Sequence, residues 1–172
     1  PASRSTWVTV WVAEHVTDRG DASGTGWYDP SSGSVLTDLI DLAVGGSAWS
    51  GRVPRVLGPT ESAGTIIAES ASALGLPSHV TIGPGTGDNM GAALGLGLAP
   101  GDIALSLGTS GTVYAVSPTG TADPTGLVAG FADAAGGFLP LVCTLNATKV
   151  TDTVAAWLGT DAAGLADLAV TV

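Results

Sequence analysis

The sequence contains few of the residues on which several classes of protein depend. Lys and Arg together number 5 among 172 residues, against 15 Asp and Glu, so the formal net charge is −10. So few cations leave little basic surface for the phosphates of nucleic acids or for anionic lipid headgroups. The single cysteine, Cys143, excludes an internal disulfide, and two histidines without a CxxC pair are too few for a structural zinc site. We therefore expect no nucleic acid and no membrane among the partners, and we assign no metal-ligating residue.

Long apolar runs and targeting signals are also missing. The longest nearly uncharged apolar stretch, residues 90–99, is about half of the roughly 20 residues that a membrane-spanning helix needs. Residues 1–6 are polar and are not followed by the apolar stretch of a signal peptide. Hydrophobic residues nevertheless make up 45% of the chain, which is too many for a disordered protein. These features predict a soluble, cytoplasmic protein with a folded core.

Glycine, in contrast, is abundant, and its 26 residues are distributed unevenly. They cluster between apolar runs at residues 83–97 and again at residues 108–111. Such clusters mark turns at which the backbone comes close to a ligand or to another segment of the chain. The two clusters are therefore the first candidates for a functional site.

Hydrophobic periodicity predicts an α/β architecture with mixed sheets. In the first part of the chain we expect a β-prone start at residues 7–16 and polar loops at 18–30 and 45–59. We expect helices at residues 35–44, 60–74 and 88–98 and a strand at 79–82. From residue 102 the period changes to two, which predicts one hairpin over residues 102–116, a second over 127–144 and a final helix over 147–158 capped by Asn146. We place a domain boundary at the Pro100-Gly101 pair, so that residues 1–100 and 101–172 belong to different domains.

The first candidate motif is Gly85-Thr86-Gly87-Asp88-Asn89, at the start of the helix expected over residues 88–98. A carboxylate at this place commonly caps free backbone N–H groups and meets the positive end of the helix dipole. It can also serve as a general base at the mouth of a cleft, with Asn89 beside it to orient a polyol. A dinucleotide site is a third interpretation, but Gly91 comes one residue too late for GxGxxG.

The second candidate motif consists of Gly108, Thr109, Ser110, Gly111 and Thr112. It can be a tight hairpin turn whose hydroxyl groups bond to their own backbone. It can also be a nest of N–H and hydroxyl groups that surrounds a phosphate. The low number of basic residues favours this mode, because a phosphate would have to be held by backbone N–H groups, hydroxyls and a bound cation.

Three segments, taken together, resemble the FGGY family of carbohydrate kinases and most closely its xylulokinase branch. They are TDRGDASGT at residues 17–25, GPGTGDN with AALGLG at residues 83–97, and SLGTSGT at residues 106–112. Their order and spacing fit the family, and the likeness covers roughly residues 14–159.

The resemblance implies the actin-like, ribonuclease-H-like two-domain ATPase fold of sugar kinases, with the active site between the domains. It implies ATP-dependent phosphorylation of D-xylulose to D-xylulose 5-phosphate, with Mg²⁺ as cofactor. It assigns Asp88 as the general base and Asn89 as a sugar contact. It makes Thr109 the residue that faces the γ-phosphate, within a phosphate- and ATP-binding turn formed by Gly108, Thr109, Ser110, Gly111 and Thr112.

The sequence also departs from the family. Family members are about three times as long, and the segments expected to hold Mg²⁺, adenosine and the rest of the sugar pocket have no counterpart. We therefore expect a fragment that spans the end of the first domain and the start of the second. An inactive truncated remnant, a kinase for another ketopentose or polyol, and a dinucleotide-binding enzyme are the alternatives, and a homodimer is a further possibility.

Overall fold

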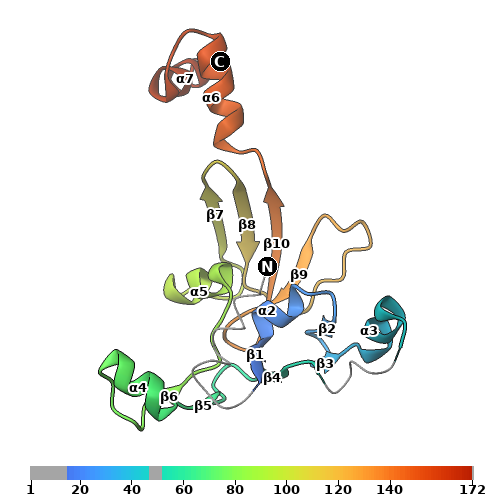
Figure 1. The fold of residues 1–172 in the computed structure, drawn as a ribbon. Helices are drawn as coiled ribbons and strands as arrows, with labels where there is room; N and C mark the ends of the chain where they lie inside the picture. The colour runs from blue at the N-terminus through green and yellow to red at the C-terminus, as the bar shows by residue number, and fades with distance from the viewer. Residues whose placement is uncertain (1–14, 47–51, 172) are drawn as a thin grey trace.

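The computed structural model describes residues 15–46 and 52–171, so the β-prone start expected over residues 7–16 lies outside the described residues except at its end, where Val16 begins a strand. Short elements fill the first part of the described chain (Figure 1): β1 (Val16–Asp18), α2 (Arg19–Ser23), β2 (Tyr28–Asp29), β3 (Ser34–Val35), α3 (Thr37–Val44), β4 (Arg55–Leu57), β5 (Gly64–Thr65), α4 (Ala68–Leu74), β6 (Thr81–Ile82) and α5 (Asp88–Gly95). Strands β1 and β4 are parallel, whereas β2 pairs with β3 and β5 with β6 in antiparallel fashion.

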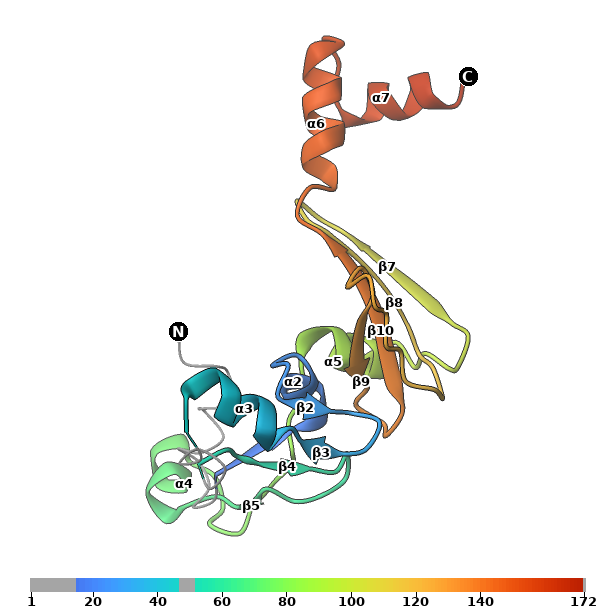
Figure 2. The ribbon, with the colours of Figure 1, turned by 90° about the vertical axis from the view of Figure 1, so that its right-hand side faces the viewer.

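The second part is built on one antiparallel sheet with the strand order β7-β8-β10-β9. Its elements are β7 (Ile103–Leu107), β8 (Gly111–Ala115), β9 (Ala129–Ala132), β10 (Phe138–Thr144), α6 (Thr148–Trp157) and α7 (Ala162–Ala169). Both hairpins predicted from the period of two are confirmed, as is the mixed α/β character. Figure 2 shows that α6 and α7 project beyond the end of the sheet.

Several local predictions are wrong, and each has a physical reason. The first polar loop contains α2, because the Asp18 carboxylate caps that helix by accepting from the Asp21 N–H at 3.0 Å. The second contains β4, which is held beside β1. The helix expected from residue 60 begins only at Ala68, since the preceding residues form β5 and pair with β6. Asn146 does not cap α6, because the helix starts one residue later than expected and its N-cap residue is Ala147, whose methyl side chain cannot accept a hydrogen bond.

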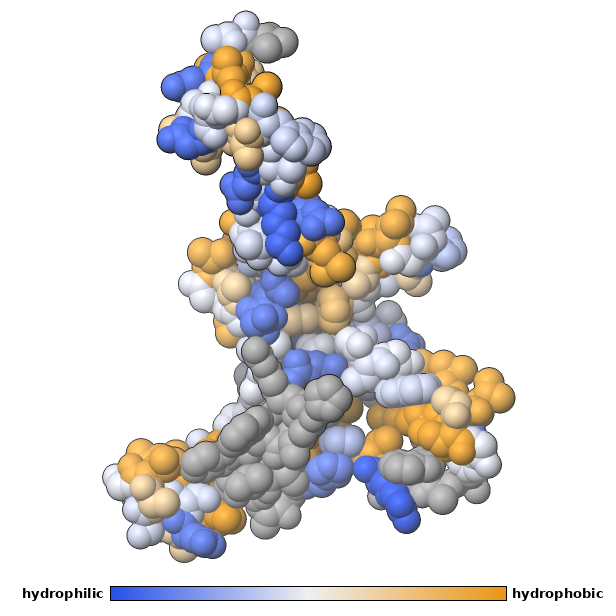
Figure 3. Space-filling view, turned by 45° about the horizontal axis from the view of Figure 1, so that its top comes forward, coloured by the Kyte–Doolittle hydropathy of each residue, from blue (hydrophilic) through white to orange (hydrophobic). Residues whose placement is uncertain are grey.

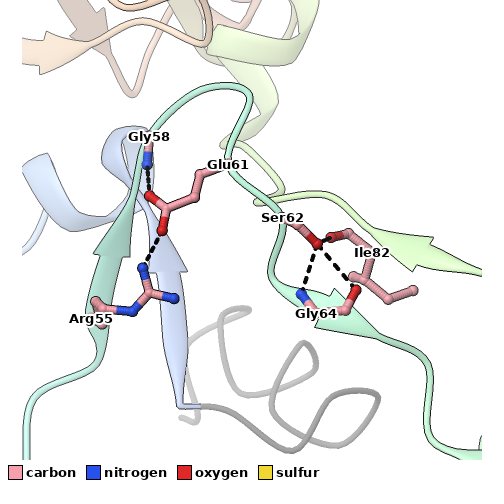
Figure 4. A network of polar contacts seen from close by, with 6 residues as sticks. All are labelled: Arg55, Gly58, Glu61, Ser62, Gly64 and Ile82. Atoms are coloured by element: carbon pink, nitrogen blue, oxygen red, sulfur yellow. Dashed lines mark hydrogen bonds and ion pairs between the residues drawn. The ribbon is translucent and has the colours of Figure 1, made fainter.

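The turn between β4 and β5 is held by the polar contacts drawn in Figure 4. The Glu61 carboxylate accepts from the Gly58 N–H at 3.0 Å and forms an ion pair with Arg55. Both donors hold the pKa of Glu61 below its usual value, and the Gly58 N–H has a larger effect than the Arg55 guanidinium. The Ser62 hydroxyl accepts from the Gly64 N–H at 3.0 Å, which turns the chain into β5.

A small core joins α5 to one face of the four-stranded sheet. Buried residues from α5, β8 and β10 form it: Met90, Ala93, Tyr114, Leu139 and Leu141. A second cluster of Val16, Leu57 and Ala63 lies under β1 and β4. The first core fixes the start of α5 relative to the β7-β8 hairpin, and these are the two segments that carry the candidate motifs.

Much apolar surface is left exposed. The molecule exposes 10592 Å², whereas a compact monomer of this mass would expose about 7,600 Å². The sheet face opposite α5 presents exposed side chains from three strands, namely Ile103, Leu105, Leu107, Val113 and Val142. Figure 3 shows further apolar groups over α3 on the right and α4 on the lower left. In the described ranges, no helix is long and apolar enough to cross a membrane.

The close approach of β9 to the preceding loop leads to a stability prediction. A Cβ atom on Gly130 would meet the backbone carbonyl of Thr121, and a backbone atom cannot move aside as a side chain can. We expect Gly130→Ala to lower the free energy of unfolding by up to about 3 kcal/mol. Gly95→Ala is the matched control, because no atom lies within 4 Å of its added Cβ and alanine favours a helix. Urea unfolding of the two variants measures the difference, and an equal stability would contradict the prediction.

Candidate active site

Asp88 and Asn89 occupy the first turn of α5. The N-cap residue is Gly87, which has no side chain to cap the helix, and Asp88 follows it with an exposed carboxylate. The Asn89 backbone N–H and its side-chain Nδ2 both donate to Asp88 Oδ1, at 2.8 and 3.2 Å. The carboxylate therefore faces outward from the start of the helix, and the amide of its neighbour holds it in place.

Residues 108–110 form the turn between β7 and β8, and residues 111 and 112 begin β8; the five residues together are called here the 108–112 turn. The Thr148 and Ala147 N–H groups donate to the carbonyls of Gly108 and Thr109 at 2.9 and 3.0 Å, which attaches the turn to the start of α6. In the described part of the chain, the hydroxyls of Thr109 and Ser110 make no hydrogen bond. The turn thus presents two hydroxyl groups that are not used by their own backbone, as a phosphate site would require.

One side-chain contact brings the two motifs together. The Thr112 hydroxyl donates to Asn89 Oδ1 at 3.5 Å, across 23 residues of sequence. This contact links the start of β8, within the 108–112 turn, to the start of α5. The two sequence motifs are therefore neighbours in space, although Gly108, Thr109 and Ser110 lie farther along the hairpin.

Asp88 and Asn89 line a cavity of about 480 Å³, called here the Asp88 cavity. Its polar wall also includes Thr17, Asp21 and Thr25, which belong to or flank α2. Its apolar wall comes from several elements and includes Trp27, Tyr28, Val35, Val53, Pro54, Val56, Met90 and Phe131. None of the described residues that line it is Lys, Arg or His. A hollow of this kind suits a small neutral molecule with hydroxyl groups better than an anion.

The contribution of β9 to the Asp88 cavity was not predicted from the sequence. Phe131 reaches the cavity from β9, because α2 and β9 lie in contact: the Ala132 N–H donates to the Ser23 hydroxyl at 3.0 Å. A Cβ on Gly24 would lie 2.9 Å from the Phe131 ring, so a glycine is needed for this approach. Asp21 lies within the motif at residues 17–25, and this position was the one signal that could have identified it.

Metal-binding groups are sparse near the cavity. Across residues 15–46 and 52–171, no three His, Cys, Asp or Glu side chains lie close enough to hold an ion together. Phosphate groups fit better, since the hydroxyls of Thr109 and Ser110 make no hydrogen bond within the described residues.

Comparison with known proteins decides the relationship. No family model matches the chain. The xylulose kinase of Streptomyces rubiginosus is 52% identical over 150 residues, which are 87% of this chain and 30% of that enzyme. This chain is a homologue of the xylulose kinases. The xylulose kinase of Haemophilus influenzae is 31% identical over 145 residues, or 83% of this chain and 29% of that enzyme. The chain thus spans about 30% of the length of these relatives.

Solved structures agree with the sequence comparison. The xylulose kinase from Bifidobacterium adolescentis is 41% identical, with a TM-score of 0.72 over 85% of this chain and 31% of that one. A xyloylose kinase from Brucella ovis is 27% identical, with a TM-score of 0.82 over 94% of this chain and 33% of that one. Gluconate kinase from Lactobacillus acidophilus, at 22% identity and a TM-score of 0.74, shares the fold. The resemblance to FGGY-family sugar kinases and the expected fold class are both confirmed for this xylulose kinase homologue.

Proposed function

We propose that this chain is part of an ATP-dependent kinase that converts D-xylulose to D-xylulose 5-phosphate. The observation that carries the proposal is that Asp88 and Asn89 both line the Asp88 cavity, while Asn89 also contacts Thr112 of the candidate phosphate turn. The names of the relatives support the sugar, and the neutral, hydroxyl-compatible cavity supports a polyol acceptor.

The proposed roles follow from the chemistry of each group. The Asp88 carboxylate takes the proton of the sugar hydroxyl as the hydroxyl oxygen attacks the γ-phosphorus, and the bond to the bridging oxygen of ADP breaks. The Asn89 amide binds a sugar hydroxyl and keeps the base in place. The hydroxyls of Thr109 and Ser110 and the N–H groups of the 108–112 turn bind the γ-phosphate. ATP supplies the phosphoryl group, and Mg²⁺ would offset its charge.

The proposal also covers the domains. Residues up to 100 would belong to the sugar-binding domain and residues from 101 to the nucleotide-binding domain, so that the contact between Asn89 and Thr112 spans their boundary. The exposed apolar sheet face supports the view that further parts of a kinase fold cover this chain in the active enzyme. The homodimer and the cytoplasmic location are still predictions from the sequence.

The test is a full-length chimaera, in which this chain replaces the matching segment of the Streptomyces rubiginosus xylulose kinase. We expect kcat/KM for D-xylulose to exceed that for D-ribulose or glycerol by at least about tenfold, a difference of about 1.4 kcal/mol in transition-state binding. ADP release from Mg·ATP measures each rate, and the unmodified Streptomyces enzyme is the control. Equal rates with the three acceptors would refute the substrate, and saturable NADH binding without kinase activity would favour the dinucleotide alternative.

A further inference from the structure

We propose that the Thr112 side chain is a positioning residue for the sugar side of the site rather than a ligand of the phosphate. Its hydroxyl orients the Asn89 amide, and the amide in turn orients the Asp88 carboxylate. This inference rests on the proposed function and assigns Thr112 a different role from the other hydroxyl residues of the 108–112 turn.

First, a threonine hydroxyl can donate only one hydrogen bond. A hydroxyl group has one proton to donate, and Thr112 donates it to Asn89 Oδ1. A phosphate oxygen that is ionised accepts hydrogen bonds and donates none. While Thr112 binds Asn89, its hydroxyl therefore has no proton for a phosphate. Thr109 and Ser110, whose hydroxyls make no bond within the described residues, keep theirs.

Second, the oxygen and the nitrogen of the Asn89 amide bind different partners. Oδ1 accepts from Thr112, and Nδ2 donates to Asp88 Oδ1 at 3.2 Å. Rotating the amide by 180° would place its oxygen against the carboxylate, so Asp88 selects the orientation in which Nδ2 donates to it. In that orientation Oδ1 faces Thr112, and the hydroxyl stabilises it by donating its proton. Thr112 therefore acts on the Asp88 carboxylate through the Asn89 amide.

The sheet makes Thr112 a firm support. It lies in β8 opposite Ser106 on one side and Cys143 on the other, so its backbone is paired with both neighbouring strands. Gly111 before it is buried, and a Cβ there would lie 3.1 Å from Ala147 at the start of α6. The distance of 3.5 Å to Asn89 is long for a hydroxyl donor, and such contacts at catalytic groups commonly shorten once substrate binds.

The variants Thr112→Val and Thr112→Ser of the full-length chimaera test the inference. Valine keeps the shape and loses the proton, whereas serine keeps the proton. We expect Thr112→Val to lower kcat/KM for D-xylulose by about tenfold while the KM for ATP changes by less than about twofold. Thr112→Ser should restore kcat/KM to within about threefold of the parent, because one retained hydrogen bond accounts for most of the effect. In an Asn89→Ala background, Thr112→Val should cause no further loss, since the amide through which it acts is gone.

Each other outcome overturns the inference. A raised KM for ATP with an unchanged kcat/KM for the sugar would make Thr112 a phosphate ligand. A serine variant as impaired as the valine variant, or losses that add in the Asn89→Ala background, would remove the role of the hydroxyl. Thermal unfolding of each variant shows whether it has folded like the parent. If the parent chimaera phosphorylates no sugar, both the proposed function and this inference fail. If the parent is active and its Thr112 variants are as active as the parent, only this inference fails.

Discussion

Replacing Asp88 by Asn in the full-length chimaera is expected to lower kcat by about 10²–10⁴-fold, equivalent to about 3–5 kcal/mol of barrier. Asparagine has nearly the same shape and can still accept the Asn89 N–H, so the helix start should be preserved. It cannot take a proton from the attacking hydroxyl. The loss should therefore appear in kcat, measured as initial rates of ADP release at saturating D-xylulose and ATP.

Asp38→Asn is the matched control for this substitution. Asp38 is exposed in the first turn of α3, which has eight residues as α5 does, and it does not line the Asp88 cavity. Removing its charge from the first turn of a helix of the same length should leave kcat within about twofold of the parent. A loss below about tenfold at Asp88, or an equal loss at the two positions, would rule out Asp88 as the base.

Leu139→Ala is expected to lower the free energy of unfolding by about 2–5 kcal/mol. Leu139 on β10 is fully buried and belongs to the core that holds α5 against the sheet. Truncation leaves a cavity between the helix that carries Asp88 and the strands that carry the 108–112 turn. The substitution should therefore lower both stability and activity, although it removes only apolar atoms.

Leu127→Ala provides the comparison for Leu139. Leu127 is 74% exposed, so its truncation should change the free energy of unfolding by less than about 0.5 kcal/mol. Urea unfolding of the chimaera, followed by tryptophan fluorescence, compares the two variants. Similar midpoints for both would show that the α5 core contributes little, and the geometry of the site would then need another support.

Local patterns were sufficient where neighbours in sequence are also neighbours in space. The alternation over residues 102–116 predicts a hairpin because β7 and β8 pair with each other directly, and the turn glycines sit where the chain reverses. The start of α5 follows from the glycine turn before Asp88. The helix expected from residue 60 was wrong because β5 pairs with β6, which comes more than ten residues later, and periodicity carries no information on that pairing.

The same limit applies to the site. Asp88 and Asn89 stand out because both lie in one short motif with a recognisable chemistry. Phe131 enters the Asp88 cavity only because Gly24 lets α2 approach β9, a contact between segments more than 100 residues apart. The bond from Thr112 to Asn89 likewise exists only after the sheet and α5 have packed through Met90 and Tyr114. Asp88, the proposed base, could therefore be found from the sequence, whereas the contacts of Phe131 and Thr112 depend on tertiary packing.

The most direct test of the account is the product formed from Mg·ATP and D-xylulose by the full-length chimaera and by its Asp88→Asn variant. Phosphorus NMR identifies the product, and the 172-residue chain is assayed beside them. The account predicts D-xylulose 5-phosphate from the parent chimaera, formed in step with ADP, and almost none from the Asp88 variant. A parent chimaera that folds but releases no sugar-dependent ADP, or a variant as active as the parent, would contradict it.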